Sequence, residues 1–476
     1  MNATKLMLSS ALAVLVAACS GPQLTPPKPL PAAPTSWSAE TNADQEAVVL
    51  DWWKGLNDPQ LDRLVETALA HNADLRAATA NWEASRALVR EARAARLPIG
   101  TVDAGLQRTR TAGAALQLDT LGGPSVLPSQ TLIDAGTSFS WEIDLFGRVS
   151  GAVRETRAEA ERSLWARRGT EAAIAAAVVR AWSDLADANL QLALLDERQP
   201  LLTNVVAGLE QALAAGGVRR DKVEETRLVL ADAEQQRPQL EAARRNAIRR
   251  LSTLTGVPAP EGVRSMAGLT PATLPVPAYV RAGRPEDLLR LRPDVAAAEQ
   301  DLLKATARIQ VTRADLYPRL SLGGSVGVTA APGDVTDTGA LRFGVGPVLS
   351  WGVFDMGRIR ARIRAAGSQA EAAGAAWESA FLKALEETDA ALDTLAALRR
   401  VATTADQAAA TAATLADLSE TRQRAGQDSR IAAALAREQA LRTQSQQVRA
   451  TSAMRSAWID VQVALGAGWR DQGVQR

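Results

Sequence analysis

The stretch SWEIDLFGR at residues 140–148 decides the fold, because a related stretch, SWGVFDMGR, returns at residues 350–358. A second pair of matching stretches lies upstream of these two, one in each copy. HNADL at 71–75 leads towards Pro98, and LRPDV at 291–295 leads towards Pro318. Landmarks that recur in the same order indicate a tandem duplication. The two upstream stretches are separated by about ten residues more than the two downstream stretches. The loop between the upstream and downstream stretches is therefore longer in the first copy than in the second.

Each copy predicts the same order of elements. A helix of about twenty-five residues, starting at Ala73 or Pro293, leads into two strands, and a long helical hairpin follows. We therefore predict a mainly α fold with a transmembrane β portion, built from a duplicated strand pair and helical hairpin. The predicted segments are a first repeat at 61–257 (strands within 98–146, hairpin 148–255), a proline-rich connector at 258–285, a second repeat at 286–466 (strands within 318–356, hairpin 358–465) and a tail at 467–476.

The strand segments have the character of membrane strands. Alternating runs such as Thr137-Ser138-Phe139-Ser140-Trp141 and Leu320-Ser321-Leu322 suit the ~9–11 residues of a tilted transmembrane strand. A small soluble sheet is the alternative. Seven aromatic residues in or beside these segments are candidates for the aromatic girdles of a barrel: Phe139, Trp141, Phe146, Tyr317, Phe343, Trp351 and Phe354.

Two strands per copy cannot close a barrel within one chain. An unpaired backbone group in hydrocarbon costs several kcal/mol, and single-chain bacterial barrels begin at about 8 strands. If these strands enter a membrane, several copies of the chain must therefore share one closed barrel.

The helical hairpins are too long for a compact globule. Arg148 to Ala215 and Arg358 to Ala425 are each about 67 residues, and at ~1.5 Å per residue such a helix reaches about 100 Å. Glycines at 216–217 and 426 end these stretches, as glycine does at a helix C-terminus. The hairpins need neighbouring helices, which again favours an oligomer.

The N-terminus predicts a secreted lipoprotein. Lys5 precedes an apolar run that ends in Val16-Ala17-Ala18-Cys19, and this run is too short to span a membrane. We interpret 1–18 as a signal peptide and Cys19 as the acylated first residue of the mature chain, with a plain signal cut as the alternative. Residues 19–60 then form a lipid-anchored, proline-rich linker and an N-terminal segment.

Composition excludes several function classes. Lys plus Arg number 54 against 53 Asp plus Glu, so the basic excess of a nucleic-acid binder is missing. One histidine, His71, and one cysteine, Cys19, leave little for a zinc site or a catalytic triad. We predict a protein that is not an enzyme and has no cofactor or metal, apart from the covalent lipid.

The motifs at 69–75, 291–295 and 317–318, with the two blocks from Trp141 and Trp351, resemble those of TolC-like outer-membrane factors. The acylated cysteine makes the chain similar to the lipoprotein branch (OprM or NodT type) that serves RND multidrug pumps. This resemblance implies a homotrimer with a 12-stranded barrel, a 12-helix periplasmic tunnel and a mixed equatorial domain. It also implies an outer-membrane efflux channel that docks to a periplasmic adaptor and an inner-membrane transporter.

A passive conduit needs a closed resting state, and the helix tips are where converging helices can constrict it. The candidate gate residues are Gly217, Arg219, Arg220, Asp221, Gly426, Asp428, Ile431 and Leu435. Asp221 and Asp428 are equally well explained as solvated residues at a helix end or as helix N-caps. The family often has an aspartate where this chain has Leu435, which favours an apolar constriction by Ile431 and Leu435 over an acidic one.

Other functions stay open at this point. The runner-up within the same class is a type I protein-secretion channel. A periplasmic adaptor or an envelope scaffold lipoprotein is the alternative from another class. The sequence does not specify the cargo, since partners select it.

Overall fold

The structure is a computed structural model that describes residues 29–37, 43–44, 47–109, 130–266, 268–269, 271 and 273–470. The predicted signal peptide 1–18 and the predicted lipidation site, Cys19, lie outside these residues. The chain divides into two compact units. One contains residues 83–161 and 300–375, and the other contains 29–82, 162–299 and the chain from 376 onward.

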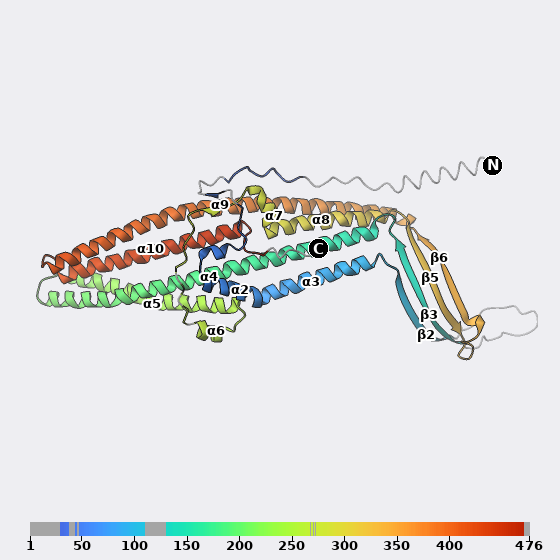
Figure 1. Cartoon of the computed structure of the whole chain (residues 1–476), viewed down its shortest axis with the longest axis horizontal. Helices are drawn as coiled ribbons and strands as arrows, with labels where there is room; N and C mark the ends of the chain where they lie inside the picture. Colours follow the sequence, from blue (N-terminus) through green and yellow to red (C-terminus); the bar gives the residue numbers. More distant parts are fainter. Residues whose placement is uncertain are drawn as a thin grey trace, which may run out of the picture. The chain divides into compact units, whose positions relative to one another are not determined.

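The first unit holds a four-stranded antiparallel sheet (Figure 1). Its strands are β2 (Ile99–Thr109), β3 (Gln130–Ile143), β5 (Arg319–Ala330) and β6 (Leu341–Ser350), in the order β2-β3-β5-β6. Two strands from each sequence copy were predicted, and this is confirmed. The central pair β3–β5 joins the two copies, with Trp141 opposite Leu322, while β2 and β6 are the edges.

Helices enter and leave this sheet in the same way in both copies. α3 (Ala73–Ala94) leads into β2, and α8 (Pro293–Ala314) leads into β5. α4 (Arg148–Ala214) follows β3, and α9 (Met356–Arg424) follows β6 after the short 3-10 turn η4 (Val353–Asp355). A further 3-10 turn, η3 (Thr338–Ala340), precedes β6.

The second unit contains the helical hairpins and small elements around their middle. α4 turns into α5 (Arg220–Leu254), and α9 turns into α10 (Arg430–Ala464), which confirms the predicted hairpin in each copy. The small elements are β1 (Ala43–Asp44) paired in parallel with β4 (Val280–Arg281), η1 (Trp52–Leu56), α2 (Pro59–His71), α6 (Ala259–Met266), η2 (Pro285–Asp287) and α7 (Leu288–Leu291).

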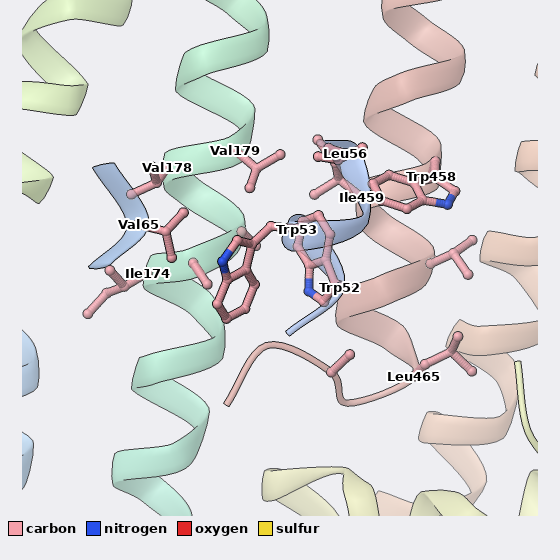
Figure 2. Close-up of a cluster of buried hydrophobic side chains, with 14 of the residues drawn as sticks. Trp52, Trp53, Leu56, Val65, Ile174, Val178, Val179, Trp458, Ile459 and Leu465 are labelled. Carbon is pink, nitrogen blue, oxygen red and sulfur yellow. The ribbon is translucent and has the colours of Figure 1, made fainter. Parts of the chain in front are cut away.

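Tryptophans from η1 fill the core of the second unit (Figure 2). Trp53 is fully buried, and the rings of Trp52 and Trp458 meet edge to face with centroids 5.2 Å apart. Trp458 belongs to α10, and Val178 and Val179 of α4 line the same cluster. Burying such large rings removes much apolar surface from water, so η1 holds α4 and α10 of the unit together.

No helix in the described part of the chain combines the length and the apolar character that crossing a membrane requires.

Candidate functional site

The sheet of the first unit has one mainly apolar face and one mainly polar face. Residues alternate between faces along a strand, and residues paired across strands share a face. The register therefore puts these residues on one face: Val102, Leu106, Ile133, Phe139, Trp141, Leu322, Val326, Val328, Phe343, Val345 and Leu349. The other face carries Thr101, Asp103, Gln107, Asp134, Ser138, Ser140, Glu142, Ser321, Ser325, Thr329 and Arg342.

Large apolar side chains of the apolar face are exposed in the described part of the chain. Val102 is 84% exposed and Phe343 is 80% exposed, although both are large apolar side chains. Strands that alternate in this way, apolar outward and polar inward, are typical of a barrel wall in a membrane. The 10 to 14 residues of each strand also suffice for the ~9–11 needed to cross.

Small residues allow the two central strands to approach closely on the polar face. A Cβ on Gly327 would lie 2.7 Å from the carbonyl oxygen of Ala135 and 2.8 Å from the Cα of Gly136. Side chains at this crossing would push β3 and β5 apart, so glycine is needed on both strands.

The girdle candidates occupy both the strands and their junctions with the helices. Phe139, Trp141 and Phe343 lie on the apolar face. The Trp141 indole Nε1 donates a hydrogen bond of 2.8 Å to the Arg96 carbonyl. The Trp141 ring is therefore held at the end of the strand, where aromatic side chains favour a membrane interface.

The second copy repeats this arrangement. The Trp351 indole Nε1 donates a hydrogen bond of 3.0 Å to the Leu316 carbonyl. Phe146 stacks on Tyr317 with centroids 4.5 Å apart, and Phe354 is fully exposed beside the start of α9. A girdle role for all seven aromatic residues stays a prediction.

Charges on the polar face are partly paired. Asp134 accepts hydrogen bonds from Arg342 and, at 3.4 Å, from the Thr329 hydroxyl. Asp103 accepts a hydrogen bond of 3.1 Å from the Thr101 hydroxyl. Among the described residues, Asp103 has no cationic partner. Sequence reasoning missed these residues, although strict alternation along β2 would have found Asp103.

The helix tips have the same geometry in both hairpins. Gly216 and Gly426 have φ values of +73° and +75°, a left-handed conformation that favours glycine. The following residues, Gly217 and Gln427, donate backbone hydrogen bonds to Ala212 and Arg422. The candidate gate residues include Gly217 and Gly426, but Gly217 is not the structural counterpart of Gly426. Gly216 occupies that position, since only one residue in each tip must be left-handed.

Salt bridges occupy the charged residues of the first tip. Arg219 stands at the N-cap position of α5 without a side-chain cap, and it forms an ion pair with Asp221. Arg220 lies 3.8 Å from Glu224. Asp221 is therefore an ion-pair partner in the first turn of the helix, where negative charge is favourable.

In the second tip, Ser429 caps α10 by accepting a hydrogen bond of 3.1 Å from the Ala432 amide. Asp428 instead accepts a hydrogen bond of 3.2 Å from the Ser419 hydroxyl. Neither aspartate is a helix N-cap, because Arg219 and Ser429 occupy those positions, whereas Asp221 is an exposed residue at the end of a helix.

Ile431 and Leu435 are half-buried between the tips. They pack against a cluster of Val205, Leu209 and Val223 from the first hairpin. Their packing ties α10 to α4 and α5 near the tips. The apolar constriction proposed for them stays a prediction.

The Arg-Pro-Asp motif has a clear structural role. The Arg292 guanidinium, which is buried, donates to the carbonyl of Ala464 at the end of α10, at 3.1 Å. It also binds Asp294 and, at 2.7 Å, Glu387 of α9. Partial burial by itself would raise the pKa of Asp294. The hydrogen bond from Arg292 outweighs burial and holds this pKa below its usual value. This contact therefore stabilises the fold at neutral pH and weakens as the pH falls.

Asn72 performs the equivalent task in the first copy. Its side-chain Nδ2 donates to the carbonyl of Leu254 at the end of α5, at 3.1 Å. Its Oδ1 accepts from the amides of Asp74 and Leu75, so it also caps α3.

His71 is the last residue of α2 and is exposed. Within the described ranges, no three His, Cys, Asp or Glu residues gather where they could hold a metal ion.

Known proteins share this arrangement. The sequence profile described as "outer membrane efflux protein" matches residues 64–257 and 285–467. The pyoverdine export outer membrane protein OpmQ of Pseudomonas putida is 31% identical over 471 residues, which cover 96% of each chain. Outer membrane protein OprJ of Pseudomonas aeruginosa is 30% identical, over 97% of this chain and 95% of OprJ.

Solved structures agree. The outer-membrane channel OprN is 30% identical with a TM-score of 0.79, covering 95% of this chain and 99% of that one. The CmeC outer membrane channel of Campylobacter jejuni is 19% identical with a TM-score of 0.80, covering 95% of both chains, and it supports the fold alone.

Proposed function

This chain belongs to the outer membrane efflux protein family and is the outer-membrane channel of an efflux pump, and from that premise we propose that three copies form one conduit. Each copy contributes four strands, so three copies make a barrel of twelve strands. Each copy also contributes α4, α5, α9 and α10 to the wall of a periplasmic tunnel. The channel is not an enzyme, and it conducts its cargo passively.

The alternation of apolar and polar residues along the strands carries this proposal. The exposed apolar face fits hydrocarbon, and the polar face fits a water-filled lumen. The free edges β2 and β6 need partners inside a membrane, because unpaired backbone groups are costly there. Neighbouring copies supply those partners, edge to edge.

Reconstitution tests the conduit directly. The purified full-length protein, added to a planar lipid bilayer, is expected to give discrete conductance steps. Crosslinking in detergent is expected to give a trimer. A monomer that inserts but never conducts would rule out the shared conduit.

The proposed gate lies at the helix tips around Gly216 and Gly426. Small rigid shifts of converging helices can widen or close such an opening. An apolar constriction by Ile431 and Leu435 is the form of gate that we propose, since hydrophobic rings gate by excluding water.

The proposed partners are a periplasmic adaptor and an inner-membrane RND-type transporter, which supplies the energy. OpmQ is named for pyoverdine export, and its similarity supports an export role here. The partners select the cargo. Pull-down of the crosslinked complex from cells, followed by mass spectrometry, identifies both proteins, and a deletion strain assayed for drug sensitivity identifies the cargo class.

Asp103 is expected to make the channel prefer cations. Three copies place three such carboxylates on the polar face, each without a cationic partner among the described residues, and rings of this kind select ions by charge. In Asp103→Asn, the zero-current potential across a KCl gradient should fall roughly by half.

The variant Gln107→Glu provides the opposite test on the same face of β2. It adds a carboxylate and should raise the cation preference. An unchanged potential in both variants would show that this face does not line the lumen.

Cys19 is the proposed lipidation site, and the strands should hold the protein in the outer membrane without it. We expect Cys19→Ala, exported with a signal cut by the general signal peptidase, to lack acyl chains by intact mass. It should still remain in the membrane after a high-pH wash, because the apolar strand faces stay inserted. Release into the soluble fraction would show that the lipid is the main anchor.

A further inference from the structure

Positive charge gathers where the helices meet the sheet. Four segments of the first unit adjoin the strands: 86–97, 144–157, 308–319 and 353–364. They contain fourteen arginines and five acidic residues, although the whole chain has a net charge of only +1. The arginines are Arg86, Arg90, Arg93, Arg96, Arg148, Arg154, Arg157, Arg308, Arg313, Arg319, Arg358, Arg360, Arg362 and Arg364. We call these four segments the basic collar.

One ridge of the collar combines an aromatic residue with two arginines. Phe354, Arg358 and Arg362 are four residues apart, so they lie along one flank of the start of α9. Phe354 is fully exposed, and Arg358 and Arg362 are exposed too. Ile359 and Ile363 point inward and are buried. We call Phe354, Arg358 and Arg362 the interfacial ridge.

The ridge lies at the depth of lipid headgroups if the strands span the membrane. Phe354 follows β6 by four residues, and the headgroup layer is about 5–8 Å deep on each side of the hydrocarbon. Arg358 and Arg362 stand about 6 and 12 Å further along the helix axis. Helical side chains lean towards the helix N-terminus, which here is the sheet, so both guanidinium groups reach back towards that layer.

The exposed phenyl ring decides which side of the wall the ridge faces. Leu97, between α3 and β2, and Leu145, between β3 and α4, are 64% and 60% exposed. Large apolar side chains that border an apolar sheet face are favourable beside lipid and unfavourable beside a water-filled lumen. Arg358 and Arg362 share the flank of Phe354, so they face the same side.

We propose that the interfacial ridge binds the phosphate groups of anionic phospholipids in the periplasmic leaflet of the outer membrane. Guanidinium groups bind phosphate oxygens with two parallel hydrogen bonds, and clustered arginines beside a membrane span favour anionic lipid. Arg358 also pairs with Asp355, which leaves other guanidinium N–H groups for the lipid. This inference rests on the proposed function, because the ridge reaches headgroups only when the strands are inserted.

Native mass spectrometry of the purified full-length trimer tests the proposal with phosphatidylglycerol and phosphatidylethanolamine as probes. We expect wild type to retain phosphatidylglycerol preferentially. Arg358→Gln/Arg362→Gln should weaken this binding at least about tenfold. The matched control is Arg360→Gln/Arg364→Gln, which removes the same charge from the opposite flank of the same helix and should bind within about twofold of wild type.

Four results would overturn the proposal. The ridge variant could bind phosphatidylglycerol as tightly as wild type, or the control variant could lose as much as the ridge variant. Millimolar inorganic phosphate could displace the lipid, which would indicate a site for free anions. A ridge variant that no longer forms a trimer would assign the ridge to a contact between copies. Planar-bilayer conductance of the wild type checks the proposed function separately, so failure of the channel and failure of the lipid site are distinguishable.

Discussion

Gly466→Ala is expected to lower the free energy of unfolding by about 3–5 kcal/mol, whereas Gly426→Ala should cost only about 1–2 kcal/mol. Both glycines have a φ of +75°, so an alanine at either site pays the same backbone strain. They differ in what surrounds them. A Cβ at Gly466 would lie 2.7 Å from the carbonyl carbon and oxygen of Leu291, and nothing lies within 4 Å of one at Gly426.

The crowding at Gly466 comes from the way each repeat closes on itself. The last residue of the short helix before α8, Leu291 of α7, approaches the glycine that follows the returning helix α10. Gly256 shows the same contact in the first copy, with a Cβ that would lie 2.9 Å from the His71 carbonyl oxygen. Backbone atoms cannot move aside as a side-chain end can, so the clash at Gly466 forces the two segments apart.

Chemical denaturation of the purified protein, followed by the far-UV circular dichroism of its helices, measures both variants. The difference between Gly466→Ala and Gly426→Ala isolates the cost of the clash from the cost of the left-handed backbone. Equal losses in the two variants would show that the close approach to Leu291 is absent in solution.

Removing either partner of the ion pair between Arg198 and Glu438 is expected to cost about 3–5 kcal/mol. The side chains of Arg198 on α4 and Glu438 on α10 are 6% and 8% exposed. The Arg198 Nε and Nη2 atoms lie 2.9 and 2.8 Å from the Glu438 Oε1. Arg198→Ala or Glu438→Ala leaves a buried charge without its partner, which is the costly outcome.

The double variant Arg198→Met/Glu438→Leu is the informative control. It removes both charges and keeps most of the side-chain volume, so its stability should lie within about 1–2 kcal/mol of wild type. Leu194, Leu441 and Val448 already form an apolar cluster between the same two helices.

A second double variant, Arg198→Ala/Glu438→Ala, tests whether the two residues interact. If the losses of stability in the two single variants simply add in it, the residues do not interact, and the buried pair is not formed.

Local patterns were sufficient to predict the strand pairs and the helical hairpins. Alternation around Thr137–Trp141 and Leu320–Leu322 predicted strands, and helix-favouring stretches that end in glycine predicted the hairpins. These signals work because a strand's period of two and a glycine's left-handed backbone are properties of a few consecutive residues. Because the sequence is duplicated, the strand pair predicted for the first copy also predicted a strand pair in the second copy.

Contacts between distant segments could not be predicted in the same way. Nothing near Arg198 in the sequence identifies Glu438, which is 240 residues away, as its partner. The choice of Gly216 over Gly217 as the left-handed residue required the observed end of α4. The repeated stretch at 291–295 had already drawn attention to Arg292, but its contact with the carbonyl of Ala464 became visible only in the fold.

The amino-acid order by itself thus determined the strand pairs, the helices before them and the helical hairpins, that these occur twice, and that four strands cannot close alone. The tertiary structure decided which side chains share a face or a buried contact: the continuous polar face with Asp103 and Asp134, the packing of Ile431 and Leu435 between the tips, and the seam at Arg198 and Glu438. The physical reason is that backbone preference acts over a few residues, whereas desolvation and packing depend on how segments far apart in the chain approach one another.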